Sequence, residues 1–238
     1  MSVSFNEFLE LYNKLDNLCQ KHYRVESRTE SSIMRHINNL RRSKYYKDND
    51  RAEDLDAIRN LRNSLVHESL IDGKHLFNVE DVVIDILKKE ILILEDPKKA
   101  IDVMMLFNNV YKASLDSLTI NILNTMQEKG YSHVPILGPD NNLYGVFSEN
   151  VIASRLNKEL KIDISNNEKI YEYFDYLPID KHINERYIFV SKNTLVEDII
   201  KYFENSKKEY GKKLAMVFVT ENGKQNEKLL GIILPSSF

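Results

Sequence analysis

The sequence predicts a multi-domain protein, in which an all-α four-helix bundle is followed by an α+β repeat. Glycine and proline are scarce, with 7 and 5 residues among 238, and this scarcity favours long helices. Six of the glycines and four of the prolines lie beyond Pro97. Apolar residues recur at helical spacing before Pro97, whereas short apolar runs separated by turn residues follow it. We therefore expect one domain over residues 1–96 and a second over residues 97–238.

The first 96 residues contain four stretches in which apolar residues lie three and four positions apart. This spacing predicts helices over residues 4–22, 31–43, about 50–66 and about 82–91. Short loops between helices are typical of a small bundle. Asp96-Pro97 is the predicted boundary, because proline fits the first turn of a new helix after an aspartate cap.

The region beyond this boundary contains two similar units. A predicted helix over residues 119–129 precedes two short apolar runs, 132–137 and 143–147, whose turn-rich connection predicts a β-hairpin. The same order recurs in a helix that opens at Thr194-Leu195, followed by apolar runs over residues 214–219 and 229–233.

The spacing of matching residues defines the repeat. Leu118 and Leu195 are 77 residues apart and Gly145 and Gly231 are 86 apart, so the second copy carries about nine extra residues. Each copy is too small to bury its own apolar face. We therefore expect the copies to pack together, with one over about residues 100–156 and the other over about 180–238.

The repeat resembles a tandem pair of cystathionine-β-synthase (CBS) domains, the Bateman module. The matching stretches are Met126–Ile136, Leu143–Glu149, Leu214–Thr220 and Leu230–Ile233. The resemblance implies a cleft between the copies that binds an adenine nucleotide (AMP, ADP or ATP) or S-adenosylmethionine and controls a neighbouring domain. The ligand would be regulatory, and no cofactor is expected to be required.

The candidate ligand-binding residues divide into a base slot and ribose positions. Val134 and Pro135, with Tyr131 and His133 beside them, offer an apolar slot for a base. The family contacts the ribose through Ser or Thr at the end of the last strand and Asp three residues later. The first copy has Ser148 but Val151, and the second has Leu234 and then Ser237. Both ribose motifs are therefore altered, so a different ligand, weak binding and a purely structural or dimerising module remain alternatives.

A motif late in the third predicted helix suggests a second activity. The string Leu61-Arg62-Asn63-Ser64-Leu65-Val66-His67-Glu68 resembles the active motif of the HEPN superfamily, which includes metal-independent endoribonucleases. Cleavage of RNA by its own 2′-hydroxyl needs a proton acceptor, for which His67 is suited, and a cation on the phosphate, for which Arg62 is suited. Asn63 would orient either residue.

The geometry of one helix qualifies this assignment. At about 100° per residue, Arg62 and His67 point about 140° apart, so one straight helix does not aim both at one phosphate. The resemblance implies that two motifs meet across a homodimer. As an alternative, Arg62 pairs with acids and His67 lies at a helix C-terminus, in a scaffold or RNA-binding domain that is not catalytic.

Charge patterning offers a further candidate surface. No acidic residue occurs between Ser31 and Lys47, whereas acids dominate residues 48–56. One interpretation is a phosphate-facing strip that contacts RNA through Arg35, Arg41 and Arg42. The other is that the basic and acidic helix faces pair with each other.

Composition excludes several other classes. The net charge of −3 hides no strongly basic domain, so affinity for nucleic acid cannot be inferred from the overall charge. A single cysteine, Cys19, excludes an internal disulfide and fits a reducing compartment. The chain contains no HExxH motif, Cys pair or His pair at metal-ligand spacing, so no metal site is predicted. We expect a cytoplasmic protein without a membrane partner, because there is neither an 18-residue apolar run nor a signal peptide.

Overall fold

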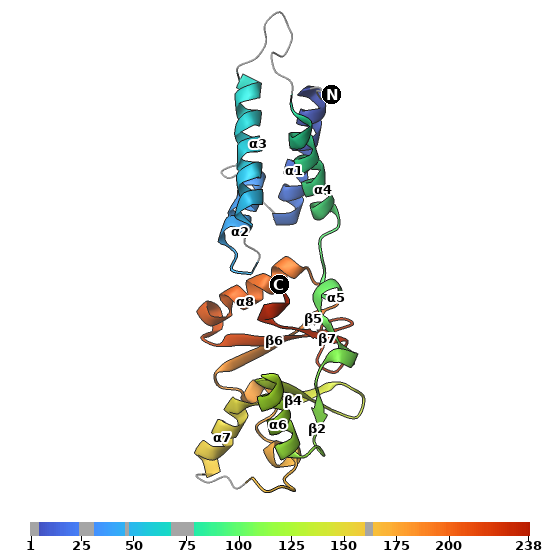
Figure 1. The fold of residues 1–238 in the computed structure, drawn as a ribbon, viewed down its shortest axis with the longest axis vertical. Coiled ribbons are helices and arrows are strands. Elements are labelled where there is room, and N and C mark those ends of the chain that lie inside the picture. Colours follow the sequence, from blue (N-terminus) through green and yellow to red (C-terminus); the bar gives the residue numbers. More distant parts are fainter. Residues whose placement is uncertain (1–4, 24–30, 46–47, 68–78, 160–163) are drawn as a thin grey trace, which may run out of the picture. The chain divides into compact units, whose positions relative to one another are not determined.

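The computed structural model describes residues 5–23, 31–45, 48–67, 79–159 and 164–238, without the side chains of residues 66 and 67. The chain divides into two compact units, Met1–Pro97 (unit 1) and Lys98–Phe238 (unit 2) (Figure 1). The N-terminal unit is helical and the C-terminal unit is α+β, as the sequence predicts.

The helices of unit 1 lie where the apolar periodicity predicts them. Their bounds are Phe5–Tyr23 (α1), Ser32–Arg42 (α2), Asn49–His67 (α3) and Asp81–Glu95 (α4). Helix α1 packs against α2 and α4, and α3 packs against α2 and α4. All four contribute to one apolar core, whose fully buried members include Phe8, Leu15, Ile37, Leu55 and Leu87.

A buried carboxylate joins the helices of unit 1. Glu90 on α4 is 2% exposed, and its Oε1 lies 2.6 Å from Nε2 of His36 on α2. Arg51 on α3 donates its Nε proton to Glu90 Oε2 at 2.7 Å, and Nδ1 of His36 lies 2.6 Å from the Tyr23 hydroxyl at the end of α1. Burial alone would raise the pKa of Glu90, but the hydrogen bonds from His36 and Arg51 lower it to about 2. The charge of Glu90 is therefore a link among all four helices.

The predicted helix start at Asp96-Pro97 is wrong. Asp96 is instead the C-cap of α4, and its N–H donates to the carbonyl of Leu92. The next helix, α5, covers Ala100–Val103. Backbone hydrogen bonds of Lys98 and Ala100 to residues 196 and 194 hold the intervening segment in an extended course.

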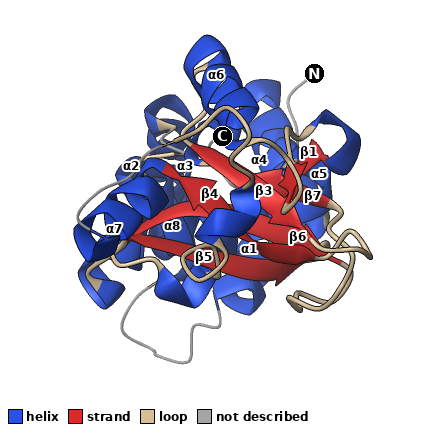
Figure 2. Ribbon diagram, turned by 90° about the horizontal axis from the view of Figure 1, so that it is seen from below, coloured by secondary structure: helices blue, strands red, loops and turns tan. Residues whose placement is uncertain are grey.

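Unit 2 contains two sheets whose strands Figure 2 draws in red. The strands of the first sheet, in spatial order, are Ala113–Ser114 (β2), His133–Leu137 (β3) and Leu143–Ser148 (β4). Those of the second are Met105–Leu106 (β1), Gly231–Ile233 (β7), Lys213–Thr220 (β6) and Glu185–Ser191 (β5). In both sheets, a parallel pair (β2–β3 or β5–β6) is followed by an antiparallel pair (β3–β4 or β6–β7). The antiparallel pairing of β3 and β4 confirms the predicted hairpin.

Helices also occupy matching places in the two halves of unit 2, with α6 before β3 and α8 before β6. Their bounds are Thr119–Lys129 (α6), Glu149–Glu159 (α7) and Val196–Tyr210 (α8). The 3₁₀ helices are Phe107–Asn109, Ile170–Tyr173, Ile179–Lys181 and Pro235–Ser237. Helices α6 and α8 have leucine at the N-cap, Leu118 and Leu195, and end at left-handed glycines, Gly130 and Gly211. Helix α7 and strand β5 were not predicted.

Each half of unit 2 is completed by a segment from the other half. Strand β1, which opens the first half, pairs with β7 at the end of the second half. Reciprocally, the carbonyl of Leu177, which precedes β5, accepts the N–H of Val146 on β4 at 2.9 Å. The side chains of Ile170, Tyr173 and Leu177 are fully buried in the core of the first half. The segment that opens the first half therefore packs on the second half, and the segment that precedes β5 packs on the first half.

Two glycines at matching positions permit this exchange. A Cβ atom on Gly145 would lie 2.2 Å from the carbonyl oxygen of Leu177, and one on Gly231 would lie 2.4 Å from that of Met105. Backbone atoms cannot move aside as a flexible side chain can. The 86-residue spacing of these glycines thus corresponds to two equivalent close approaches between backbones.

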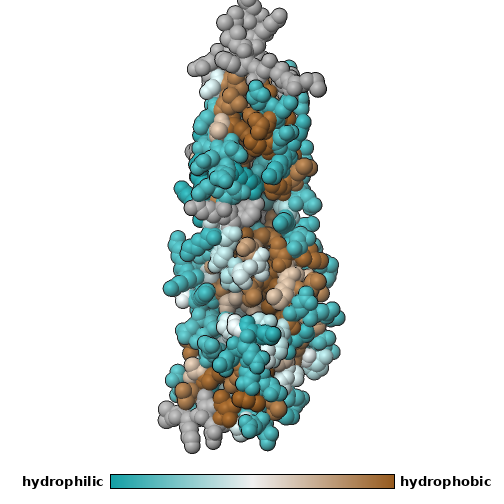
Figure 3. Space-filling model, viewed as in Figure 1, coloured by the Kyte–Doolittle hydropathy of each residue, from teal (hydrophilic) through white to brown (hydrophobic). Residues whose placement is uncertain are grey.

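The surface differs from these cores in character. The face shown in Figure 3 is largely hydrophilic, with separate apolar patches on both units. No helix in the described part of the chain is long and apolar enough to cross a membrane.

We expect Gly145→Ala and Gly231→Ala each to lower the free energy of unfolding by about 1–3 kcal/mol or more, since the added methyl group forces a backbone apart. Gly138→Ala is the matched control, because its Cβ would come close to the Asn142 side chain and would meet the Asn142 backbone oxygen only at an ordinary contact distance of 3.9 Å. Differential scanning calorimetry of the full chain measures the three variants. Equal melting temperatures for all three would contradict the close-approach explanation.

We expect Glu90→Gln to destabilise unit 1 by about 3–5 kcal/mol near neutral pH, because it removes the buried negative charge that His36 and Arg51 both contact. The folded pKa of Glu90 is lowered from 4.5 to about 2, so its stabilisation is complete above 4.5 and is lost as the pH falls through about 2. The difference between variant and wild type should shrink over that range. Urea denaturation followed by circular dichroism measures it.

The control for this prediction is Glu95→Gln on the same helix. Glu95 forms an exposed ion pair with Lys14, which contributes at most about 1 kcal/mol. A Glu90→Gln variant as stable as Glu95→Gln would overturn the assignment.

Candidate functional site

An open cavity of about 140 Å³ lies in unit 2. It is bordered by the loop between α6 and β3 and by the end of β7. The lining residues are Met105, Val110, Tyr111, Gly130, Tyr131, Ser132, His133, Pro135, Met216, Ile232 and Leu234. Apolar side chains form most of this surface, and hydroxyl and imidazole groups supply the polar contacts.

Three of the predicted base-slot residues line this cavity and one does not. Tyr131, His133 and Pro135 are lining residues, and the Tyr131 ring stacks on Tyr111 with centroids 5.8 Å apart. Val134 is instead fully buried in the core of the first half. Successive side chains of a strand point to opposite faces, so Val134 cannot share the face of His133 and Pro135.

The two serines predicted at ribose positions lie outside the cavity lining. The Ser148 hydroxyl is buried and donates to Glu185 Oε2 at 3.0 Å. The Ser237 hydroxyl accepts the backbone N–H of Leu234 at 3.0 Å. Leu234 itself lines the cavity. Both hydroxyls therefore already have partners within the chain.

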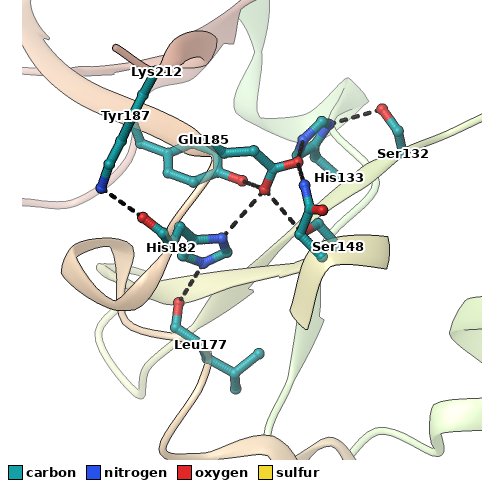
Figure 4. A network of polar contacts seen from close by, with 9 residues as sticks. Ser132, His133, Ser148, Leu177, His182, Glu185, Tyr187 and Lys212 are labelled. Atoms are coloured by element: carbon teal, nitrogen blue, oxygen red, sulfur yellow. Dashed lines mark hydrogen bonds and ion pairs between the residues drawn. The ribbon is translucent and has the colours of Figure 1, made fainter. Parts of the chain in front are cut away.

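Ser148 belongs to a network around Glu185, the first residue of β5, which Figure 4 shows. Five side chains contact the Glu185 carboxylate at 2.6–3.3 Å, and together with Glu185 we call them the Glu185 cluster. They are His133, Ser148, Asn150, His182 and Tyr187. The first three belong to the first half of unit 2 and the others precede or belong to β5, so the cluster joins the two halves.

Burial and charge in this cluster act in opposite directions. Burial alone would raise the pKa of Glu185, but hydrogen bonds from His133, His182 and Tyr187 hold it far below its usual range. Burial and the adjacent Glu185 carboxylate raise the pKa of Tyr187, which stays protonated and donates at 2.8 Å. Glu185 is thus an anion held by hydrogen-bonding side chains from both halves of unit 2.

His182 lies between two hydrogen-bond acceptors of unit 2. Its side chain is 1% exposed, Nδ1 lies 3.3 Å from Glu185 Oε2, and Nε2 lies 3.2 Å from the Leu177 carbonyl. Both partners are hydrogen-bond acceptors, so the buried ring bridges the Glu185 carboxylate and the Leu177 carbonyl.

Sequence reasoning missed the centre of this network. Glu185, His182, Asn150 and Tyr187 belong to no motif that the sequence presents. One signal was available, because Glu185 and Tyr187 are two residues apart and therefore share a face of a strand. Strand β5 itself was not predicted, so that spacing could not be interpreted.

The candidate residues of unit 1 are partly described. Arg62 and Asn63 lie on α3, with Arg62 Nη1 3.4 Å from Asn63 Oδ1. The guanidinium of Arg62 lies 5.6 Å from the centroid of the Tyr12 ring on α1. Its Nε is buried without a hydrogen-bond acceptor among the described residues. His67 is the last residue of α3, but its side chain and Glu68 lie outside the described residues.

The predicted RNA-contacting arginines have different surroundings. Arg41 pairs with Asp56 on α3 at 2.9 Å, and Arg59 pairs with the same carboxylate at 2.9 Å. These hydrogen bonds lower the pKa of Asp56. Arg35 and Arg42 are exposed. Pairing between the basic and acidic helix faces, the alternative interpretation, is therefore present at Arg41.

Within the ranges that the structure describes, no three His, Cys, Asp or Glu side chains are grouped so that they could hold a metal ion.

Comparison with known proteins identifies part of unit 2. Residues 100–158 match the CBS domain family, so this stretch carries a CBS domain. No curated protein matches the chain.

Several solved structures are similar to part of this chain at low sequence identity. CBSX2 in complex with AMP is 17% identical over 58% of this chain and 91% of its own, with a TM-score of 0.42. A hemolysin-like protein containing a CBS domain from Oenococcus oeni PSU is 20% identical over 59% and 87%, with a TM-score of 0.40. The CBS domain of the bacterial CNNM/CorC family Mg²⁺ transporter, in complex with the inhibitor IGN95a, is 16% identical over 62% and 76%, with a TM-score of 0.39.

Proposed function

We propose that the protein is a regulator in which a tandem CBS pair binds an adenine-nucleotide-type ligand and controls a HEPN-like helical domain. The observation that carries the ligand proposal is the cavity beside Tyr131. Its mostly apolar lining and the stacked pair Tyr111–Tyr131 suit a flat aromatic ring, which gains from stacking and from leaving water. The Ser132 hydroxyl at the same wall, which lies 2.7 Å from His133 Nδ1, offers a hydrogen bond to the edge of such a ring.

The charge of the cavity supports a ligand recognised through its adenosine moiety. None of its described lining residues is Lys or Arg. The nearby Lys112 donates to the carbonyls of Phe107 and Val110 at 2.9 and 3.1 Å, so its ammonium is already engaged. Phosphates would therefore remain in solvent, and AMP, ADP, ATP and S-adenosylmethionine would differ little in affinity.

We also propose that unit 1 cleaves RNA without a metal ion, as a HEPN-like domain. The observation in favour is that the Nε of Arg62 has no acceptor among the described residues, so the guanidinium keeps capacity to bind an RNA phosphate. His67 would act as the general acid/base, and Asn63 would orient the arginine it adjoins. Because Arg62 and His67 lie on one helix about 140° apart, two copies of α3 in a homodimer would supply one phosphate with both groups.

The second candidate function is a non-catalytic one, in which unit 2 senses a ligand or dimerises and unit 1 is an inert or RNA-binding scaffold. The packing of Arg62 on Tyr12 and the Arg41–Asp56 pair favour it, since both arrangements also stabilise helix contacts. The two tests below separate these functions.

We expect isothermal titration calorimetry to detect adenosine, AMP and ATP binding with similar affinities, because the cavity holds the shared moiety. Tyr131→Ala should weaken binding about 10-fold, since stacking of a base on an aromatic ring contributes about 1–3 kcal/mol. Tyr202→Ala, which removes an exposed tyrosine on α8, is the matched control. Absence of binding would leave unit 2 as a dimerising module, and equal binding by Tyr131→Ala would contradict a site in this cavity.

We expect the full chain to cleave single-stranded RNA in the presence of EDTA, with a rate at least about 100-fold lower in Arg62→Ala and in His67→Ala. Arg59→Ala is the control, because Arg59 lies on the same helix but is paired with Asp56. Cleavage by the double variant Arg62→Ala/His67→Ala at the wild-type rate would reveal a contaminant. RNA binding without cleavage would select the non-catalytic function.

A further inference from the structure

Strand pairing in unit 2 establishes which residues of the two halves correspond. Ile136 pairs with Gly145 in the first sheet, and Val219 pairs with Gly231 in the second, so Ile136 and Val219 are equivalent. In the neighbouring parallel pairs, Ala113 is the partner of Ile136 and Val190 is the partner of Val219. Ala113 and Val190 are therefore equivalent as well.

This correspondence relates the open cavity to the Glu185 cluster. Met216 lies three residues before Val219, as His133 lies three before Ile136. Leu234 follows Gly231 by three residues, as Ser148 follows Gly145 by three. Val110 precedes Ala113 by three residues, as Tyr187 precedes Val190 by three.

Three apolar lining residues of the cavity are thus replaced by three polar residues at the equivalent place. Met216, Leu234 and Val110 line the cavity. Their counterparts His133, Ser148 and Tyr187 all contact the Glu185 carboxylate, at 2.9, 3.0 and 2.8 Å. The two halves therefore differ at equivalent places. One place is the open cavity with its apolar lining, and the other is polar and is occupied by the Glu185 side chain.

The polar position has the composition of an anion site. Besides those three residues, Asn150 Nδ2 donates to Glu185 Oε1 at 2.6 Å, and the buried imidazole of His182 lies against Oε2. Five contacts satisfy the lone pairs of one carboxylate group, which accepts about four hydrogen bonds. No second carboxylate is in contact with this group among the described residues, and Lys212 holds the His182 carbonyl at 2.8 Å (Figure 4).

We propose that the Glu185 cluster is a carboxylate-binding site that the chain fills with its own side chain. Unit 2 then has one open cavity and one internally occupied site, and an external carboxylate has access to the second only where the Glu185 side chain is displaced or removed. This proposal does not depend on the identity of the ligand in the open cavity or on activity of unit 1.

The test is chemical rescue of Glu185→Ala with acetate as the probe. The variant should melt below the wild type, and saturating acetate should raise its melting temperature by about 2–4 °C relative to chloride of equal ionic strength. Acetamide, which has nearly the same shape without the charge, should raise it far less. Wild type should show no difference between acetate and acetamide, since its site is occupied.

Glu168→Ala is the matched control variant. Glu168 is a buried glutamate of the same unit, and its one ion-pair partner among the described residues is Arg155, at 3.2 Å. Acetate should not distinguish it from wild type. If Glu185→Ala does not fold in chloride, the helical signal recovered on refolding in acetate and in acetamide gives the same comparison. Equal effects of acetate and acetamide on Glu185→Ala, or an equal acetate effect on Glu168→Ala, would overturn the proposal.

Discussion

Unit 2 depends on the exchange of two short backbone segments. The carbonyl of Leu177 binds the edge of β4 over Gly145, and Met105 in β1 lies equally close to Gly231 on β7. Each half contributes the segment that covers the last strand of the other. The shared core of Val146, Tyr187 and Phe218, and the polar contacts beside it, exist only because this exchange brings the halves together.

Each unit contains a glutamate that is shielded from solvent and contacted by donors from several elements: Glu90, which is buried, and Glu185, which is largely buried. Burial opposes the charged form in each case, and hydrogen bonds reverse that effect for Glu90 and for Glu185. A buried charge adds little net stability compared with an apolar core, but it is costly in any arrangement that separates it from its partners. These two carboxylates therefore select one arrangement of their elements. Apolar packing supplies the larger part of the stability.

The sequence was most informative where a pattern is local. Periodicity located the helices of unit 1, and the turn-rich segment after Leu137 located the β3–β4 hairpin. It was least informative where distant segments meet. Ile170 and Leu177 are buried in the core of the first half. The sequence placed them in neither copy, because it predicted copies over about residues 100–156 and 180–238. The spacing of two glycines indicated equivalent positions, but the backbone that approaches each of them is distant in sequence.

The candidate site follows the same division. A resemblance to known residues pointed to Tyr131, His133 and Pro135, and these three line the cavity. It also pointed to Ser148, whose hydroxyl is used by Glu185, 37 residues away. No local sequence pattern predicts that contact, because the position of Glu185 depends on how β5 pairs with β6. On the helix of unit 1, the spacing of Arg62 and Asn63 gave their proximity, whereas the unsatisfied Nε of Arg62 depends on packing against α1.

The exchanged segments also determine what a single copy of the repeat can be. A polypeptide with one copy would retain its opening segment but would lack the one that covers its last strand, which would then be an unpaired sheet edge prone to aggregation. Two such polypeptides can protect each other only by trading these segments, which is domain swapping. The fused chain makes that trade intramolecular, so the halves of unit 2 are expected to fold and unfold as one cooperative body.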